Sequence, residues 1–363
     1  MPELERGRLE LAYTAGLYEK HAPDGSPSDI DGGTKERTEL REWPSPNTTT
    51  TQYLKKAVQF LYMHGPGFVL RKALWRLQYA HFRRQCDSWH ARIGAKPMTV
   101  RFLNQEFELH PSGKGLSEEI LLLGAHEPMC TKAYLQLLQE GDQVLDVGSN
   151  LGYYLLLAGR AVGPSGRVMG FEPARDVYAI LQRNVVRSGL KNIQVFPWAV
   201  GNRSEDIEFY GSEIPSWGSL IREKNLLQSQ PTTVPAKRLD DLLDEFPGLR
   251  PTVLRMDVEG GELMALEGAQ RLLLKYRPRI FVEIHPFAFE WQRAHEAILL
   301  LIEMGYSSGK VIERLWDEPW ASSWVRNRRQ WSGWTEELLQ KIESRREALN
   351  TGVFTILLEH GAR

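Results

Sequence analysis

From residue 142 onward, short apolar runs alternate with longer stretches in which apolar residues recur every three or four positions. A short apolar run bounded by turn residues is typical of a buried strand, and the wider spacing is typical of an amphipathic helix. The runs predict strands at 144–147, 166–172, 192–198, 207–210, 252–257, 279–285 and 353–359, and the wider spacing predicts helices at 153–161, 173–188, 241–246, 262–276 and 294–304. Strands that alternate with helices predict an α/β fold, a mostly parallel sheet covered on both faces, with the last strand as one antiparallel edge.

Turn and cap residues add two local predictions. Residues 98–109 alternate around Asn104 and predict a hairpin that precedes the sheet. Ser117 stands directly before a predicted helix at 118–123, and Asp240 stands directly before the one at 241–246. Because short oxygen side chains accept hydrogen bonds from the first N–H groups of a helix, we expect both residues to be N-caps.

Composition divides the chain into three parts. Residues 1–50 are rich in Gly, Asp, Ser, Pro and Thr, which predicts a disordered tail. Residues 51–115 predict a helical and hairpin extension, and residues 116–363 the main domain. Within that domain, 314–351 is a Trp-rich insertion. Its indoles either pack as a lid on the sheet or stack on an acceptor molecule.

Residues 68–92 predict a basic amphipathic helix, with aromatic residues at steps of three and four and Asp87 as its one acid. Such a helix can lie on an anionic membrane surface or bind weakly to an acidic partner. An ordinary helix that packs on the main domain would show the same stripe. The sequence leaves both interpretations open.

Asp146 stands near the end of the first strand, and Gly148 and Gly152 bracket a tight turn into the next helix. A strand, a glycine loop and a helix form the first half of a nucleotide-type site. Glycine lets the backbone approach a ligand, and the start of the helix offers N–H groups.

Glu172 ends the second strand, roughly 20–25 residues after the first, where a βαβ unit places a carboxylate on a ribose diol. The loop lacks the third glycine of the dinucleotide pattern G-x-G-x-x-G, and an acid at the strand end suits an ammonium group better than a pyrophosphate. The sequence therefore favours S-adenosyl-L-methionine as cofactor. The expected cofactor-binding residues are Asp146, Gly148, Asn150, Gly152, Tyr153, Glu172 and Asp257, with Trp198 and Ala199 beside the adenine, although Trp198 fits the core equally well.

Charge and cysteine content narrow the function classes. The formal net charge of −1 does not favour nucleic acid as a partner. Two cysteines are too few for a disulfide framework and fit a reducing compartment. No apolar run reaches the length of a membrane span. We therefore expect a cytoplasmic location.

Several ordered motifs resemble the FkbM family of S-adenosylmethionine-dependent methyltransferases. They are Asp146-Val147-Gly148-Ser149-Asn150-Leu151-Gly152-Tyr153, Phe171-Glu172-Pro173, Arg238-Leu239-Asp240-Asp241-Leu242-Leu243, Asp257-Val258-Glu259-Gly260-Gly261-Glu262-Leu263 and Val282-Glu283-Ile284-His285. The resemblance covers roughly residues 117–290 and leaves out the N-terminal part and the Trp-rich insertion. It implies a class I, Rossmann-like methyltransferase fold and O-methylation of a sugar, glycan or other small natural-product hydroxyl.

Two residues are candidates for catalysis. Asp257 and His285 end neighbouring strands, so both should face the methyl group. His285 suits the role of general base, but it could equally well only bind the loop at Pro286. Asp257 would hold the cofactor ammonium or orient the acceptor. Asp257, Glu259 and His285 could also bind Mg²⁺, but this spacing is not diagnostic, and we expect no metal.

Three other functions remain open. The first is a nicotinamide-dependent oxidoreductase. The second is a nucleic-acid methyltransferase, which we do not expect because residues 257–260 do not form the Asn/Asp-Pro-Pro-aromatic signature of base N-methylation. The third is a non-catalytic binding protein on a methyltransferase scaffold.

Overall fold

The computed structural model describes residue 84 and residues 98–360, apart from 114, 124, 212–217, 221–230, 287–290, 316–329, 345 and 347–351. These residues belong to one compact unit, Leu77–Arg363. The predicted disordered tail, most of the extension that follows it and the basic helix lie outside the described residues. No helix among the described residues is long and apolar enough to cross a membrane.

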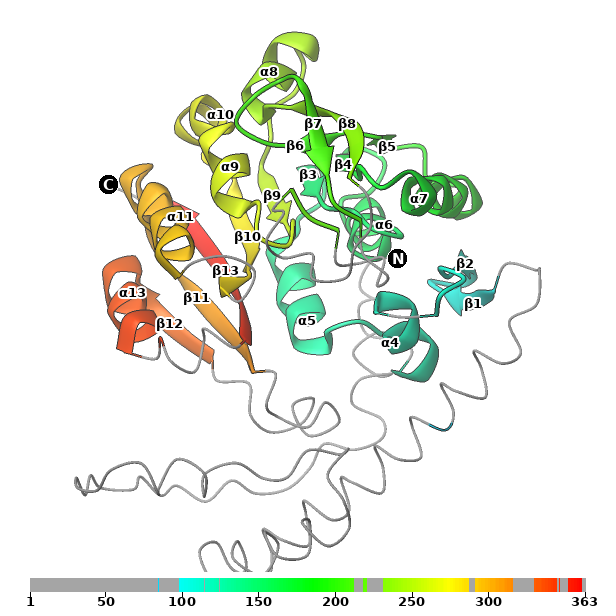
Figure 1. Ribbon diagram of the computed structural model, residues 1–363, viewed down its shortest axis with the longest axis horizontal. Helices are drawn as coiled ribbons and strands as arrows, with labels where there is room; N and C mark the ends of the chain where they lie inside the picture. Colours follow the sequence, from blue (N-terminus) through cyan, green and yellow to red (C-terminus); the bar gives the residue numbers. More distant parts are fainter. Residues whose placement is uncertain are drawn as a thin grey trace, which may run out of the picture. The chain divides into compact units, whose positions relative to one another are not determined.

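An eight-stranded sheet organises the described part of the chain, with the strand order β12-β11-β13-β10-β9-β3-β4-β5 (Figure 1). Its strands are β3 Gln143–Val147, β4 Arg167–Phe171, β5 Ile193–Phe196, β9 Val253–Met256, β10 Arg279–Ile284, β11 Tyr306–Leu315, β12 Gln330–Trp334 and β13 Gly352–His360. The five strands from β5 to β10 pair in parallel, whereas β13 runs antiparallel to both of its neighbours. The predicted α/β fold with a mostly parallel sheet is confirmed.

The position of the antiparallel strand differs from the prediction. Strand β13 is antiparallel as expected, but it lies between β10 and β11 and is not an edge. The strand at this edge of the sheet is β12, which comes from the Trp-rich insertion. The described part of that insertion thus extends the sheet, and helix α13 Thr335–Ser344 follows directly. Trp316, Trp320 and Trp324 lie outside the described residues.

Two hydrophobic cores cover the two faces of the sheet, because successive strand residues point to opposite sides. Val144 packs in one core with α5 Pro128–Leu137, α6 Tyr153–Ala161 and α7 Arg175–Ser188. Leu145 packs in the other, with helices α8 Leu239–Glu245, α9 Glu262–Glu267, α10 Gln270–Tyr276, α11 Trp291–Glu303 and α13. Figure 1 shows α11 and α13 on one side of the sheet and α5 and α6 on the other.

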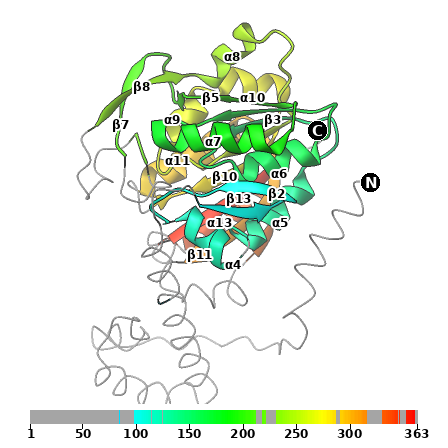
Figure 2. The same cartoon turned by 90° about the vertical axis from the view of Figure 1, so that its right-hand side faces the viewer.

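A hairpin and a helix lead into the sheet. Strands β1 Thr99–Phe102 and β2 Gln105–Glu108 pair around Leu103 and Asn104, both with positive φ, so the predicted hairpin is confirmed. Figure 2 shows the hairpin beside α7, where Arg183 and Arg187 contact the Glu108 carboxylate at 2.7 and 2.6 Å. Helix α4 Leu116–Leu123 follows.

Both predicted N-caps are wrong. Ser117 lies inside α4, and its hydroxyl accepts a hydrogen bond from the His110 N–H (2.9 Å). The Asp240 carboxylate lies inside α8 and accepts hydrogen bonds from the N–H groups of Arg271 (3.1 Å) and Leu272 (2.8 Å) at the start of α10. Asp240 therefore caps a helix that is distant in sequence.

A small second sheet lies after the third main strand. It has the order β6-β8-β7, with β6 Ala199–Val200, β7 Asp206–Phe209 and β8 Thr232–Lys237. The main chains of Tyr210 and Ser219 exchange two hydrogen bonds beyond the end of β7. This sheet brings the residues after β7 back toward the main sheet.

Candidate active site

A pocket opens beyond the carboxyl ends of β3, β4, β5 and β9. Its lining residues are Val147, Gly148, Asn150, Phe171, Glu172, Pro173, Trp198, Ala199, Val200, Phe209, Gly218, Ser219, Leu220, Asp257, Val258 and Glu259. The chain leaves β3 outward to β4 and β5, then returns to β9 on the other side of β3. Open α/β sheets bind ligands where the strand order reverses in this way.

The glycine loop is shaped first by the protein itself. Gly148 has φ +79°, and a Cβ there would lie 1.9 Å from the Asp257 carbonyl oxygen. Gly152 has φ +96°, and its Cβ would meet Leu181 at 2.8 Å. Both glycines are therefore required by backbone conformation and packing, whether or not a ligand approaches the loop.

The N–H groups of this loop are bonded within the protein. Those of Gly148 and Ser149 donate to the Phe171 carbonyl, at 3.0 Å each. The Asn150 N–H donates to Glu172 Oε2 (2.9 Å), and the Gly152 N–H to the Ser149 carbonyl (2.9 Å). A pyrophosphate would find these donors already in use.

Glu172 is fixed at the pocket by both carboxylate oxygens. Oε2 accepts from Asn150 N–H and Oε1 from Ala174 N–H, each at 2.9 Å. The residue is 7% exposed, and burial raises its pKa to about 7 although both backbone hydrogen bonds lower it. An acceptor held this firmly can recognise a pair of hydroxyl groups without reorganising.

Trp198 and Ala199 both line the pocket, as the sequence suggested. The Trp198 ring stacks on Phe196 with a centroid distance of 4.4 Å, and Lys237 Nζ lies 5.3 Å from the indole centroid. Trp198 also packs against the hydrophobic core. The indole thus belongs to both the core and the pocket wall.

Asp146 does not line the pocket. It is fully buried, and its Oδ1 accepts from Arg255 Nη1 at 3.1 Å. Arg255 Nη2 donates to Asp257 Oδ2 at 2.7 Å, and its guanidinium lies 4.5 Å from the Tyr154 ring centroid. Burial disfavours the Arg255 cation, but Asp146 and Asp257 more than offset it and raise the Arg255 pKa.

The sequence analysis did not identify Arg255 as a residue of the site. An arginine inside the otherwise apolar strand β9, Val-Leu-Arg-Met, could have indicated it. A long cation at such a position needs buried acids, and Asp146 on the neighbouring strand is its register partner. Asp146 thus positions Asp257 through Arg255, whereas we expected it to contact the cofactor.

Tyr153 and Gly152 also lie outside the pocket lining. Tyr153 is 2% exposed, and its ring stacks on Phe102 with a centroid distance of 4.9 Å. Its hydroxyl accepts from Thr131 Oγ1 at 3.3 Å. Tyr153 thus joins the hairpin and α5 to the start of α6.

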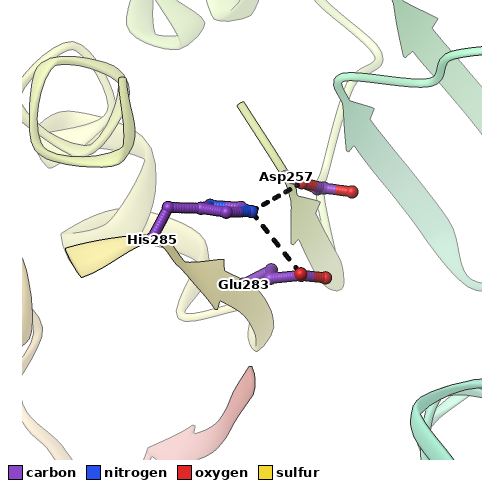
Figure 3. A group of neighbouring side chains, drawn as sticks. All are labelled: Asp257, Glu283 and His285. Atoms are coloured by element: carbon purple, nitrogen blue, oxygen red, sulfur yellow. Dashed lines mark ion pairs between the residues drawn. The ribbon is translucent and has the colours of Figure 1, made fainter. Parts of the chain in front are cut away.

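His285 is surrounded by carboxylates, as Figure 3 shows for two of them. Its Nδ1 lies 2.6 Å from Glu262 Oε1. Its Nε2 lies 3.6 Å from Asp257 Oδ1, 3.6 Å from Glu259 Oε2 and 3.5 Å from Glu283 Oε1. The predicted neighbours Asp257 and His285 are therefore brought together, and Glu283 joins them.

These carboxylates change the protonation of the cluster. Burial disfavours the His285 cation, but Glu259, Glu262 and Glu283 more than offset this and raise its pKa well above the ordinary value. Burial and the nearby Asp257 raise the pKa of Glu283. His285 itself is 1% exposed and does not line the pocket, whereas Asp257 and Glu259 do.

Comparison with known proteins identifies the domain. Residues 146–308 match the family model described as the Methyltransferase FkbM domain. Methyltransferase sdnD from Sordaria araneosa is 29% identical over 154 residues, which cover 34% of this chain and 59% of sdnD. Hexuronic acid methyltransferase AglP from Haloferax volcanii is 29% identical over 147 residues, which cover 40% of this chain and 57% of AglP. The chain thus matches less than two thirds of the length of each.

Among solved structures, methyltransferase FkbM from Methylobacillus flagellatus KT overlaps 62% of this chain and 50% of its own, with 16% identity and a TM-score of 0.35. The matched residues 146–308 contain the pocket, Glu172 and the His285 cluster. Together with the strand order, this match confirms the class I methyltransferase fold that the resemblance implied. Over residues 146–308 this chain is therefore similar to the methyltransferase domain of the FkbM family.

Proposed function

We propose that this chain is an S-adenosyl-L-methionine-dependent O-methyltransferase that acts on a hydroxyl of a sugar, glycan or other small natural product. The observation that carries the proposal is the pocket at the strand-order reversal. Glu172 is held on one side of it, and Asp257 and Glu259 line the other. When bound, S-adenosyl-L-methionine supplies a methyl group activated by a positively charged sulfur.

The residues of the pocket fit this cofactor. Glu172 offers its carboxylate to a ribose diol, the role that an acid at the end of the second strand has in such sites. Asp257 and Glu259 favour a cation in the pocket. The aromatic face of Trp198 and the small Ala199 suit a flat adenine ring.

The same residues disfavour the alternative, a nicotinamide-dependent oxidoreductase. A dinucleotide places its pyrophosphate on free N–H groups at the glycine loop. Here the N–H groups of Gly148, Ser149 and Asn150 donate to Phe171 and Glu172. The Glu172 carboxylate would also repel a pyrophosphate placed at Asn150.

Methylation of a hydroxyl needs an oriented oxygen and an acceptor for its proton. Asp257 is 23% exposed at its side chain and lines the pocket, with Oδ2 fixed by Arg255. We assign Asp257 the orientation of the acceptor hydroxyl. His285 is held behind Asp257 by Glu262, so its predicted role as general base requires a path through Asp257 or Glu259.

A carbohydrate acceptor is supported by the relative AglP, which is named as a hexuronic acid methyltransferase. The shared residues are a part of that protein, so the acceptor class is a proposal for this chain. A sugar presents several hydroxyl groups, and orienting one of them is the task to which Asp257 is suited.

The test is methyl transfer from methyl-labelled S-adenosyl-L-methionine to a panel of hexuronic acids, neutral oligosaccharides and small phenolic natural products. We expect product mass to rise by one methyl group, with the label on oxygen in at least one carbohydrate. Asp257→Asn should lower the rate about 10²-fold or more, whereas the exposed Asp176→Asn should not change it. Label found on nitrogen or carbon, or an equally active Asp257→Asn enzyme, would contradict the proposal.

A further inference from the structure

Four carboxylates face the two ring nitrogens of His285. Asp257, Glu259 and Glu283 lie 3.5–3.6 Å from Nε2, and Glu262 lies 2.6 Å from Nδ1. Glu262 and Glu283 are 0% and 4% exposed, and Arg255 pairs with Asp257. A cation shared among such buried carboxylates stabilises them, whether it is a proton on His285 or a metal ion.

The orientation of His285 defines where that cation would lie. Glu262 Oε1 accepts from both the Gly260 N–H (3.0 Å) and His285 Nδ1 (2.6 Å), so Nδ1 carries the hydrogen of this contact. The other nitrogen, Nε2, then points toward Asp257, Glu259 and Glu283. A carboxylate behind a histidine fixes the ring and its tautomer in the same way at metal sites. One further oxygen, Glu262 Oε2, is buried without a hydrogen-bond partner.

The spacing of the ligand atoms fits one shared ion. A ligand atom from each of Asp257, Glu283 and His285 lies within 4.8 Å of the others (Figure 3). The His285 Nε2 distances of 3.5–3.6 Å to Glu283 and Asp257 are close to the roughly 3–4 Å that separates neighbouring ligands of an ion bound at about 2.1 Å. Glu283 and His285 are two residues apart at the end of β10 and so share a face.

We propose that Asp257, Glu283 and His285 bind one divalent cation of the Mg²⁺ or Mn²⁺ class. Two carboxylates and one imidazole are the ligands that such ions take in proteins. The sequence pointed to Glu259 in place of Glu283, since strand register was needed to bring Glu283 to the cluster. The site lies beside Asp257, which lines the pocket, so an ion there has open positions toward an acceptor. The role of this ion in activating a hydroxyl rests on the proposed function, whereas the binding of the ion does not.

The experiment uses the full chain after chelator treatment and Mn²⁺ as the probe, because free Mn²⁺ gives a resolved paramagnetic resonance signal. Titration at neutral pH should show one Mn²⁺ bound per chain, and Mg²⁺ should displace it. Glu283→Gln and His285→Gln should each weaken binding at least tenfold. The matched control Asp244→Asn changes an acid with a 72% exposed side chain and should leave Mn²⁺ affinity unchanged.

A second readout separates ion binding from folding. Mn²⁺ should raise the thermal midpoint of the unmodified protein and leave that of Glu283→Gln unchanged. An unmodified chain that leaves the Mn²⁺ signal as in buffer, or a Glu283→Gln chain that binds as tightly, overturns the inference. A chain that binds S-adenosylhomocysteine but no Mn²⁺ overturns this inference alone. A chain that binds Mn²⁺ but no S-adenosylhomocysteine overturns the proposed function alone.

Discussion

Glu172 has an unusual combination of burial and fixed hydrogen bonds. Its pKa is raised to about 7, with burial as the largest cause. The carboxylate is therefore partly protonated at neutral pH before a ligand binds. A ribose diol donates to the ionised form, so ligand binding and ionisation of Glu172 are coupled.

This coupling predicts the pH dependence of cofactor binding. Below pH 7 the folded chain holds Glu172 protonated, so affinity for S-adenosylhomocysteine should fall as pH decreases, approaching about tenfold per pH unit. Glu172→Gln should bind weakly and lose this dependence between about pH 5 and 7. Calorimetry across that range measures both chains. A parallel decline in the two chains would assign the pH dependence to another group.

Arg255 shows how the fold keeps Asp257 in place. Arg255→Met should leave the carboxylates of Asp146 and Asp257 without their cation and lower the free energy of unfolding by about 3–5 kcal/mol. Urea denaturation measures this change. The exposed pair of Arg203 and Glu205 provides a control, because Arg203→Met should change stability by less than about 1 kcal/mol. Adding Asp146→Asn to Arg255→Met should restore part of the lost free energy of unfolding. An equal loss in the single and the double variant would show that Arg255 does not stabilise the fold by neutralising Asp146.

At the level of helices and strands, the contact between α8 and α10 depends on Asp240. Its carboxylate accepts from two N–H groups at the start of α10, and a Cβ on Gly268, at the end of α9, would lie 2.0 Å from the Gly201 carbonyl oxygen. The predicted single helix at 262–276 is therefore interrupted between α9 and α10. The small second sheet and the helices pack against each other at this break.

Asp240→Ala should lower the free energy of unfolding by about 1–2 kcal/mol, because two N–H groups of α10 lose their acceptor. The neighbouring Asp244, on the same helix α8, has a 72% exposed side chain and pairs with Arg271. Asp244→Ala should cost less than about 0.5 kcal/mol. Chemical denaturation of both variants is the measurement, and similar losses would show that Asp240 does not act as a cap.

The sequence predicted the parallel half of the sheet because its strands are short apolar runs, and β3, β4, β9 and β10 are each followed by a helix. It did not predict β11 Tyr306–Leu315, whose residues Ser308 to Lys310 break the apolar run. Strand β12 contains Gln330 and Ser332 and joins the sheet through pairing with β11 alone among the described strands. Such strands depend on tertiary pairing, which hydrophobic pattern does not encode.

The sequence likewise predicted some residues that line the pocket and some that do not line it. Glu172 and Asp257 follow from their places at strand ends, and both line the pocket. Asp146 and Tyr153 are neighbours in sequence of pocket residues, but their side chains point into buried contacts with Arg255 and Phe102. Side-chain direction within a tight loop depends on packing, so sequence spacing cannot assign it.

For the whole molecule, the pocket results from strand order. Strand β3 is central, with β4 on one side and β9 on the other, so Glu172 and Asp257 lie on opposite sides of the Gly148 loop. The small sheet adds a further wall through Ser219, whose hydroxyl donates to the Glu259 carbonyl at 2.8 Å. Both parts of the proposed reaction, cofactor binding and acceptor orientation, thus depend on the carboxyl ends of the strands of the main sheet.

The central claim is that the pocket at the carboxyl ends of these strands binds S-adenosyl-L-methionine through Glu172. Calorimetry with S-adenosylhomocysteine and, separately, with NADH tests it on the full chain. We predict one S-adenosylhomocysteine site per chain, affinity at least about tenfold weaker in Glu172→Gln, and no change in Asp244→Asn, an acid on α8 with a 72% exposed side chain. NADH should not bind measurably. Equal affinity of S-adenosylhomocysteine for the unmodified chain and Glu172→Gln, or NADH as the tighter ligand, would contradict the account.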